Sequence, residues 1–149
     1  GSGYQFIFQE IYHNYYIGKM TESEFITKCL LNYRIFKPNI NLSEQSINIL
    51  ESLKKNKELF LVSDGNSDLQ LSKVAALKLN KYICEDNIFL TGKLGKAFYK
   101  PSIKIIENSK IMKLSKVIFF GDRVVDETFA SRCRFDFQYV KNMKMLNLN

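Results

Sequence analysis

The pattern of apolar and polar positions divides the chain into two parts, and the first part predicts helices. Apolar residues recur at helical spacing over residues 4–15, in a stripe of tyrosine, isoleucine and phenylalanine. A second helix is expected after the capping box formed by Thr21 and Glu24, and a third after the N-cap Ser43. A Lys-Pro-Asn-Ile-Asn break separates these two helices. The first two helices, within residues 1–42, therefore read as one unit.

The second part, residues 43–149, changes to short apolar runs that alternate with helical stretches. Such runs, nearly continuous in apolar residues, are typical of strands covered on both faces. Alternation of strand and helix predicts a parallel sheet with right-handed crossovers, so we expect a Rossmann-like α/β core. The predicted strands are residues 58–64, 87–91, 116–122 and 135–140, and the predicted helices between them are residues 67–80, 101–113 and 126–133. The first of these helices is expected to be capped by Asn66 or Ser67.

Composition predicts an ordinary soluble domain in the cytoplasm. The 149 residues are 46% hydrophobic and 25% charged, and they contain neither an apolar run long enough to span a bilayer nor a signal peptide. A membrane partner is therefore not expected. Cys29, Cys84 and Cys133 are odd in number and lie in apolar contexts, which favours reduced, buried thiols over disulfides or a metal framework.

The net charge of +7, from 22 Lys and Arg against 15 Asp and Glu, predicts attraction to anions. The basic residues are spread along the chain, without a dense block or a nucleic-acid motif. Most of these lysines are expected to form a solvated surface, so nucleic acid is not an expected partner, and the charge alone does not name another. His13 is the only histidine, and its place among the tyrosines of the first helix favours a surface role over catalysis.

Candidate chemistry gathers where the predicted strands end, the usual place for ligands in such sheets. Gly121 ends an apolar run, and Asp122, Asp126 and Glu127 follow it closely. Carboxylates this close repel each other unless a cation lies between them, and Mg²⁺ suits a site with few protein carboxylates. The alternative is a helix N-terminus with acids that favour the helix dipole.

Ser63 and Lys100 are the other candidates. Ser63 ends an apolar strand and precedes a Gly and a helix start, a place that suits a phosphate oxygen, although a serine there is also ordinary turn chemistry. Lys100 precedes Pro101, which favours an extended conformation at the entry of a helix. Its charge could neutralise a phosphoryl group and the acids together; the alternative is a lone surface lysine.

Three segments in order resemble the motifs of the haloacid dehalogenase superfamily. They are LFLVSDGN with Ser63, FYKPS with Lys100, and IFFGDRVVDE with Asp122 followed by Asp126 or Glu127. Other stretches are similar to the subfamily that carries a helical cap inserted after the first strand. The resemblance implies a partial cap over residues 1–42 and a haloacid-dehalogenase-like Rossmann core over residues 43–149.

The same resemblance implies a magnesium-dependent phosphatase acting on a small phosphorylated metabolite. Ser63, Asp64, Gly65 and Lys100 would hold the phosphoryl group, with Lys100 as the catalytic lysine that stabilises the charged intermediate. Asp122 would bind Mg²⁺, supported by Asp126 or Glu127. Electrostatic stabilisation of this kind is the main contribution of a protein to phosphoryl transfer.

The family's first motif, an apolar strand followed by Asp-x-Asp, is missing. The chain has no Asp before Asp64, and its nearest imitation places Gln9 and Ile11 at the two acid positions. Gln9 is no nucleophile and Ile11 moves no proton. Asp64 is not expected to replace the nucleophile. We expect the first strand and the beginning of the cap to lie upstream of this chain.

Two hypotheses of function follow from the missing motif. Either the chain is most of a cap-bearing phosphatase, inactive and weak in magnesium binding by itself, or it is a degenerate, non-catalytic binding or regulatory module. In both, the family's central first strand is absent between the predicted strands at residues 58–64 and 116–122. Unpaired inner edges of this kind invite a homo-oligomer or complementation by an added strand.

Overall fold

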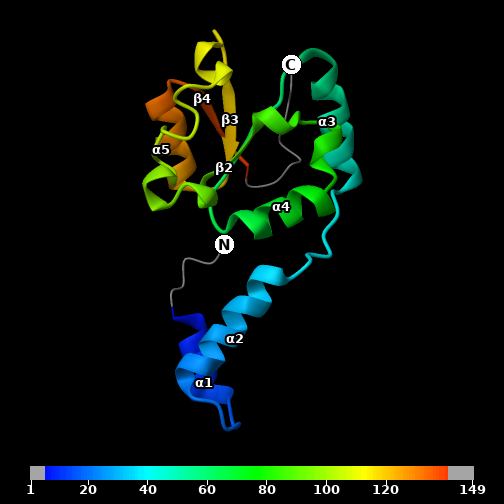
Figure 1. Cartoon of the computed structure of the whole chain (residues 1–149). Helices are drawn as coiled ribbons and strands as arrows, with labels where there is room; N and C mark the ends of the chain where they lie inside the picture. Colours follow the sequence, from blue (N-terminus) through cyan, green and yellow to red (C-terminus); the bar gives the residue numbers. More distant parts are fainter. Residues whose placement is uncertain (1–5, 141–149) are drawn as a thin grey trace.

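The computed structural model describes residues 6–140 and shows a mixed α/β fold (Figure 1). Five α-helices and four short strands are present in this part of the chain, joined by turns of 3₁₀ helix. In order, the helices and strands are α1 (Ile7–Tyr15), α2 (Glu22–Ile35), α3 (Glu44–Asn56), β1 (Leu61–Ser63), α4 (Ser67–Ala76), β2 (Ile88–Leu90), β3 (Ile118–Gly121), α5 (Val124–Cys133) and β4 (Asp136–Tyr139). None of the described helices is long and apolar enough to cross a membrane.

The helix starts agree with the predicted caps. The backbone N–H of Glu24 donates to Thr21 Oγ1 (3.3 Å), and the N–H of Thr21 donates to Glu24 Oε2 (2.8 Å), so the capping box is confirmed. Ser43 caps α3 by accepting from the N–H of Ser46 at 3.1 Å. Of the two residues proposed to cap α4, Asn66 does so, accepting from the N–H of Leu69 at 3.0 Å.

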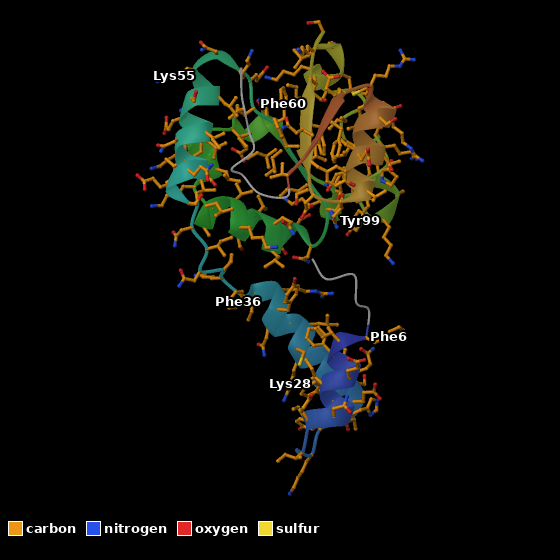
Figure 2. The ribbon with its side chains drawn as sticks, turned by 180° about the vertical axis from the view of Figure 1, so that it is seen from behind. Phe6, Lys28, Phe36, Lys55, Phe60 and Tyr99 are labelled. Carbon is orange, nitrogen blue, oxygen red and sulfur yellow. The ribbon has the colours of Figure 1, made fainter. Side chains whose placement is uncertain are left out.

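Helices α1 and α2 form a pair that extends away from the rest of the chain (Figure 1). Aromatic rings of Tyr12, Tyr16 and Phe25 hold them together, with ring centroids 4.8–5.6 Å apart. Neither helix has a buried residue. Phe36 lies at the end of α2 where the pair meets the connecting segment, and Phe6 lies at the start of the pair (Figure 2). The division into units at residue 42 stays a prediction.

The four predicted strands and their parallel direction are confirmed, but the described strands form two separate sheets. β1 pairs with β2, with Val62 opposite Phe89, and β3 pairs with β4, with Phe119 opposite Phe137. Within residues 6–140 no ladder joins β1 to β3. No strand residue is fully buried, and Ile118 is 45% exposed. The expectation that these strands are covered on both faces is therefore wrong for the described structure.

One hydrophobic cluster lies against both sheets. Its buried members come from the segment before β3 and from α5: Ile106, Ile111, Phe129 and Cys133. Half-buried side chains of the strands pack on it, among them Phe60, Val62, Phe89 and Phe119. Because Phe129 is fully buried and contacts the ring of Phe119, α5 is fixed on β3.

The predicted helix over residues 101–113 is wrong. The segment folds as successive tight turns followed by a short 3₁₀ helix at Lys110–Lys113. In the turns, Ile106 N–H donates to Ile103 O (2.9 Å) and Ser109 N–H to Ile106 O (2.8 Å). Several of its apolar residues are β-branched, which weakens helix formation, and the Ser109 hydroxyl donates to Ile106 O at 2.7 Å. This bond offers the Ile106 carbonyl a partner other than the next helical turn.

The cysteine prediction holds only in part. All three cysteines are free, as expected. Cys133 is buried, Cys29 is half-buried and Cys84 is exposed, so the expectation of buried thiols is wrong for Cys84. Burial raises the pKa of the Cys133 thiol to about 11.

Candidate functional site

A buried ion pair between Lys100 and Asp126 lies at the centre of the predicted site. Lys100 Nζ donates to Asp126 Oδ1, and the two side chains are only 7% and 4% exposed. Lys100 Nζ also lies 5.7 Å from the centre of the Phe119 ring. Two of the predicted site residues, distant in sequence, are therefore in direct contact in an environment that excludes water.

The turn from β3 into α5 positions Asp126. The backbone N–H of Arg123 donates to Asp126 Oδ2 at 3.3 Å, and Arg123 Nε lies 3.7 Å from the same oxygen. At Gly121 a Cβ atom would come within 2.4 Å of the Cβ of Asp126. The absence of a side chain at Gly121 therefore lets the first turn of α5 fold back onto the end of β3.

The pKa of Asp126 is below its ordinary value. Burial favours the neutral carboxyl, but the hydrogen bond and charge of Lys100, together with the charge and backbone N–H of Arg123, outweigh that effect. Asp126 is therefore ionised at neutral pH, and both of its oxygens have cationic or N–H partners.

Asp64 joins this pair to the end of β1. Its Oδ1 accepts from the backbone N–H of Lys100 (3.1 Å) and from Thr91 Oγ1 (3.0 Å). Thr91 is fully buried, and its hydroxyl also lies 3.3 Å from Ser63 O. Asp64 thus fixes the backbone at Lys100, while the side chain of Lys100 reaches Asp126 beyond β3.

The loop after β1 is packed closely on the segment after β2. Ser63 Oγ donates to Gln70 Oε1 on α4 at 3.1 Å. Gly65 adopts φ of +107°, a conformation that side-chain-bearing residues rarely take. A Cβ on Gly92 would lie 1.9 Å from the carbonyl oxygen of Gly65, so only glycine fits there. The Ser63–Gly65 loop is therefore held in one conformation by its neighbours.

Asp122 and Glu127 lie apart from the ion pair. The Asp122 side chain is 76% exposed and 3.8 Å from Arg123 Nε. Glu127 is exposed, and partial burial together with the negative charge of Glu127 raises the pKa of Tyr139. The three acids predicted to bind a metal share one turn but face different partners.

These donors do not fit a magnesium ion by themselves. Both oxygens of Asp126 are engaged by Lys100 and Arg123. Within the described part of the chain, no group of three or more histidine, cysteine or acidic residues could hold a metal. Mg²⁺ usually keeps several waters and one or two carboxylates, and the two carboxylates outside the buried pair, those of Asp122 and Glu127, are both exposed and face different partners.

Sequence reasoning gave no role to two residues of this site. Arg123 provides a backbone N–H and a charge to Asp126, and Gln70 accepts the hydroxyl of Ser63. The position of Arg123 between Asp122 and Asp126 in the sequence could have indicated that it pairs with an acid. Nothing in the sequence indicated a role for Gln70, because Ser63 becomes its neighbour only when the loop after β1 folds.

A cavity of about 550 Å³ lies away from these residues, along β2 and α4. Its lining is mainly apolar and includes Leu71, Val74, Phe89, Leu94 and Ile105. None of the predicted site residues lines it, so the cavity and the ion pair are separate features of the molecule.

No family model matches the chain, and no curated protein is significantly similar to it.

Proposed function

We propose that the chain supplies the phosphate-holding half of a haloacid-dehalogenase-like phosphatase for small phosphorylated metabolites and does not hydrolyse phosphate esters by itself. The observation that carries this proposal is the buried contact between Lys100 and Asp126, with Asp64 bonded to the backbone of the same lysine. A lysine that lies in a water-excluding site at the ends of parallel strands is suited to stabilise phosphoryl oxygens.

Ser63 and Gly65 support the binding of the phosphoryl group. Ser63 has a hydroxyl whose proton now goes to Gln70, and rotation of that hydroxyl would let it donate to a phosphate oxygen instead. The loop is already fixed by the contact of Gly65 with Gly92, so binding requires little ordering of the backbone. In this proposal the phosphoryl group is held by Ser63, at the end of β1, and by Lys100, in the segment between β2 and β3.

Turnover by this chain alone is not expected because the nucleophile has no replacement. Asp64, the nearest carboxylate to Ser63 in sequence, already accepts from Thr91 and from the N–H of Lys100 through one oxygen. Asp126 is held by Lys100 and Arg123. The donors present do not fit a magnesium ion, so the proposal assigns no step to the metal, and its binding at Asp122, Asp126 and Glu127 is expected to be weak or absent.

In this proposal, helices α1 and α2 are part of the cap. Tyr99, next to Lys100, lies toward the end of the α/β part from which α1 and α2 extend (Figure 2). Caps of this kind select the substrate. The exposed apolar side chains of the pair, such as Ile35 at 74% and Phe36 at 58%, would then face a substrate or further cap residues.

The proposal is tested by measuring the binding of inorganic phosphate to the full chain with isothermal titration calorimetry. We expect saturable binding that Ser63→Ala weakens several-fold. Ser72→Ala is the matched control, because the Ser72 hydroxyl bonds only within α4, to Asp68 O at 2.8 Å. Equal binding by Ser63→Ala and by Ser72→Ala would contradict the assigned role of Ser63, and no binding by the unmodified chain would contradict the proposal.

A second candidate is a non-catalytic binding or regulatory module, favoured by the fact that Asp126 is already fully partnered without a ligand. Hydrolysis of p-nitrophenyl phosphate with added Mg²⁺ separates activity from binding. We expect none from this chain. Clear hydrolysis that Asp122→Ala abolishes would show that the chain is a working enzyme and that the inactivity we propose is wrong.

A further inference from the structure

We propose that a basic cavity at the amino ends of β3 and β4 binds a small organic dianion, either a phosphate monoester or a dicarboxylate, with a short apolar body. The cavity has a volume of about 430 Å³, and small-molecule sites usually enclose about 300–1,000 Å³. None of the residues predicted to bind phosphate or metal lines it. The inference therefore holds or fails independently of the proposed function.

The cavity and the buried ion pair lie at opposite ends of α5. Asp126 stands in the first turn of this helix, whereas Cys133, its last residue, lines the cavity. The helix separates the two positions by about 10 Å. Val117, directly before β3, and Asp136, the first residue of β4, also line the cavity. Both strands therefore begin at the cavity, beside the end of α5 (Figure 1).

Three cations from different segments line the cavity. Lys116 precedes β3, Arg132 lies in the last turn of α5, and Arg134 follows that helix. Among the described residues of the lining, Asp136 is the only acid. Three positive charges therefore stand against one negative charge, and the excess suits a ligand with two negative charges.

These three cations have no acidic partner within residues 6–140, where the ion pairs involve other side chains. Arg132 Nη1 donates to Pro101 O at 3.2 Å, but this carbonyl is neutral and leaves the charge of Arg132 uncompensated. Lys116, Arg132 and Arg134 are all exposed. An anion from solvent can therefore reach them without displacing a buried partner.

The end of α5 accounts for only part of this positive charge. Cations stabilise the carboxyl end of a helix through its dipole, which is a sufficient reason for Arg132 and Arg134. It does not explain Lys116, which lies outside the helix. Moreover, the carbonyl of Ala130 near the helix end already accepts from the N–H of Phe135 at 2.9 Å. A bound dianion would give all three cations a partner of opposite charge.

Apolar side chains form another part of the lining and predict an organic body for the ligand. They include Met112, Leu114, Val117 and Phe135. Val117 and Phe135 also pack on the hydrophobic cluster, so the core holds this wall in place. An inorganic anion would leave these side chains in contact with water, whereas an organic body would cover them. The ligand is therefore an organic dianion and not free phosphate.

Arg134 and Lys78 offer a matched pair of variants. Each follows a helix in the left-handed conformation, with φ of 60° at Arg134 and 53° at Lys78, where glycine is favoured. Glycine at either position removes one positive charge and relieves the backbone, so both variants should fold. Arg134 lines the cavity and Lys78 does not. Only Arg134→Gly is therefore expected to weaken ligand binding.

Two-dimensional NMR on the full chain tests the inference, with phenyl phosphate and phthalate as probes at a pH where both are dianions. We expect saturable shifts of the amide signals of Lys116, Arg134 and Phe135 with at least one probe. Arg134→Gly should weaken binding about tenfold, as expected for the loss of one charge-assisted contact, and Lys78→Gly should leave it unchanged. Binding of phenyl phosphate alone would identify a phosphate monoester, and binding of phthalate alone a dicarboxylate.

Three outcomes would overturn the proposal. They are the absence of saturable shifts at these amides with both probes, equal weakening by Arg134→Gly and Lys78→Gly, and equal affinity for benzoate, which has the same ring but one charge. Shifts confined to Ser63 and Gly65 belong to the first of these outcomes, because they would place the probe at the proposed phosphatase site.

Two further variants test the charges of the cavity in opposite directions. Lys116→Gln should weaken binding, whereas Lys113→Gln, an exposed lysine outside the lining, should not. Asp136→Asn removes the acid of the lining and should tighten binding several-fold. Unchanged affinity in both Lys116→Gln and Asp136→Asn would contradict the assigned site.

Discussion

The helix pair α1–α2 and the unit β3–α5–β4 are both rich in aromatic residues, but they use them differently. In the unit, Phe129 is fully buried and lies 5.2 Å from the Phe119 ring. In the helix pair the rings of Tyr12, Tyr16 and Phe25 contact each other, yet no residue of either helix is buried. Aromatic contact alone therefore does not make a core.

The difference matters because the candidate site belongs to the unit with the core. Asp126 stands one turn before Phe129 in α5, and both are buried. Packing of Phe129 on the sheet therefore fixes the helix that carries the carboxylate. The helix pair has little packing of its own to define it, as expected for a part whose apolar side chains serve a further contact.

The largest effect that sharpens this contrast is expected from Phe129→Ala. Removal of a fully buried ring leaves a cavity in the cluster and should lower the free energy of unfolding by about 3–5 kcal/mol. Urea denaturation followed by circular dichroism measures it. Leu31→Ala is the matched change in α2, where Leu31 is 52% exposed, and it should have a small effect. Similar losses for both would show that the helix pair also has a core.

The next largest effect is expected from Lys100→Met, which leaves the Asp126 carboxylate buried without its main partner. Breaking a buried pair in this way typically costs about 3 kcal/mol or more. Lys110→Met is the matched control, because Lys110 pairs with Glu58 at the surface, where both side chains are about half exposed, and no measurable change is expected. Combining Lys100→Met with Asp126→Leu should recover much of the lost free energy of unfolding, because the unpaired buried carboxylate is then removed as well. No recovery would show that the unpaired carboxylate is not the cause of the loss.

Acid should weaken the unit that carries Asp126. The pKa of Asp126 is lower in the folded chain than in the unfolded one, so its contribution is fully present above the unfolded value. Stability should therefore fall as the pH drops below about 4 and protons bind the unfolded chain more readily. Urea midpoints measured from pH 6 to pH 3 would show it. Asp126→Asn should flatten this dependence, and an unchanged slope would assign the acid effect to other carboxyls.

Sequence patterns predicted the elements well where local signals decide them. The capping residues Thr21, Ser43 and Asn66 and the parallel strands follow from short patterns that the structure bears out. The turns at residues 101–113 did not follow, because an apolar helical pattern also fits a segment that buries Ile106 through tight turns.

The candidate site was only partly predictable, for a physical reason. The contact of Lys100 with Asp126 depends on two segments that meet only in the fold, although both residues were expected at strand ends. Spacing predicted Asp122, Asp126 and Glu127 as one group, but spacing does not give side-chain direction. Asp122 points to solvent and Asp126 inward, because the glycine at position 121 lets α5 turn back on β3.

The smallest effect expected is that of Thr21→Ala, and it separates the two regions most directly. The change removes the N-cap of α2 and should destabilise that helix locally by about 1 kcal/mol. Because α1 and α2 have no buried residue, this loss should raise hydrogen exchange in the helix pair while leaving exchange at Phe129 and the urea midpoint unchanged. Ser43→Ala, the corresponding cap removal at α3, is the control. If Thr21→Ala lowered the urea midpoint as much as Ser43→Ala, the helix pair would unfold together with the α/β part, and the contrast between the regions would fail.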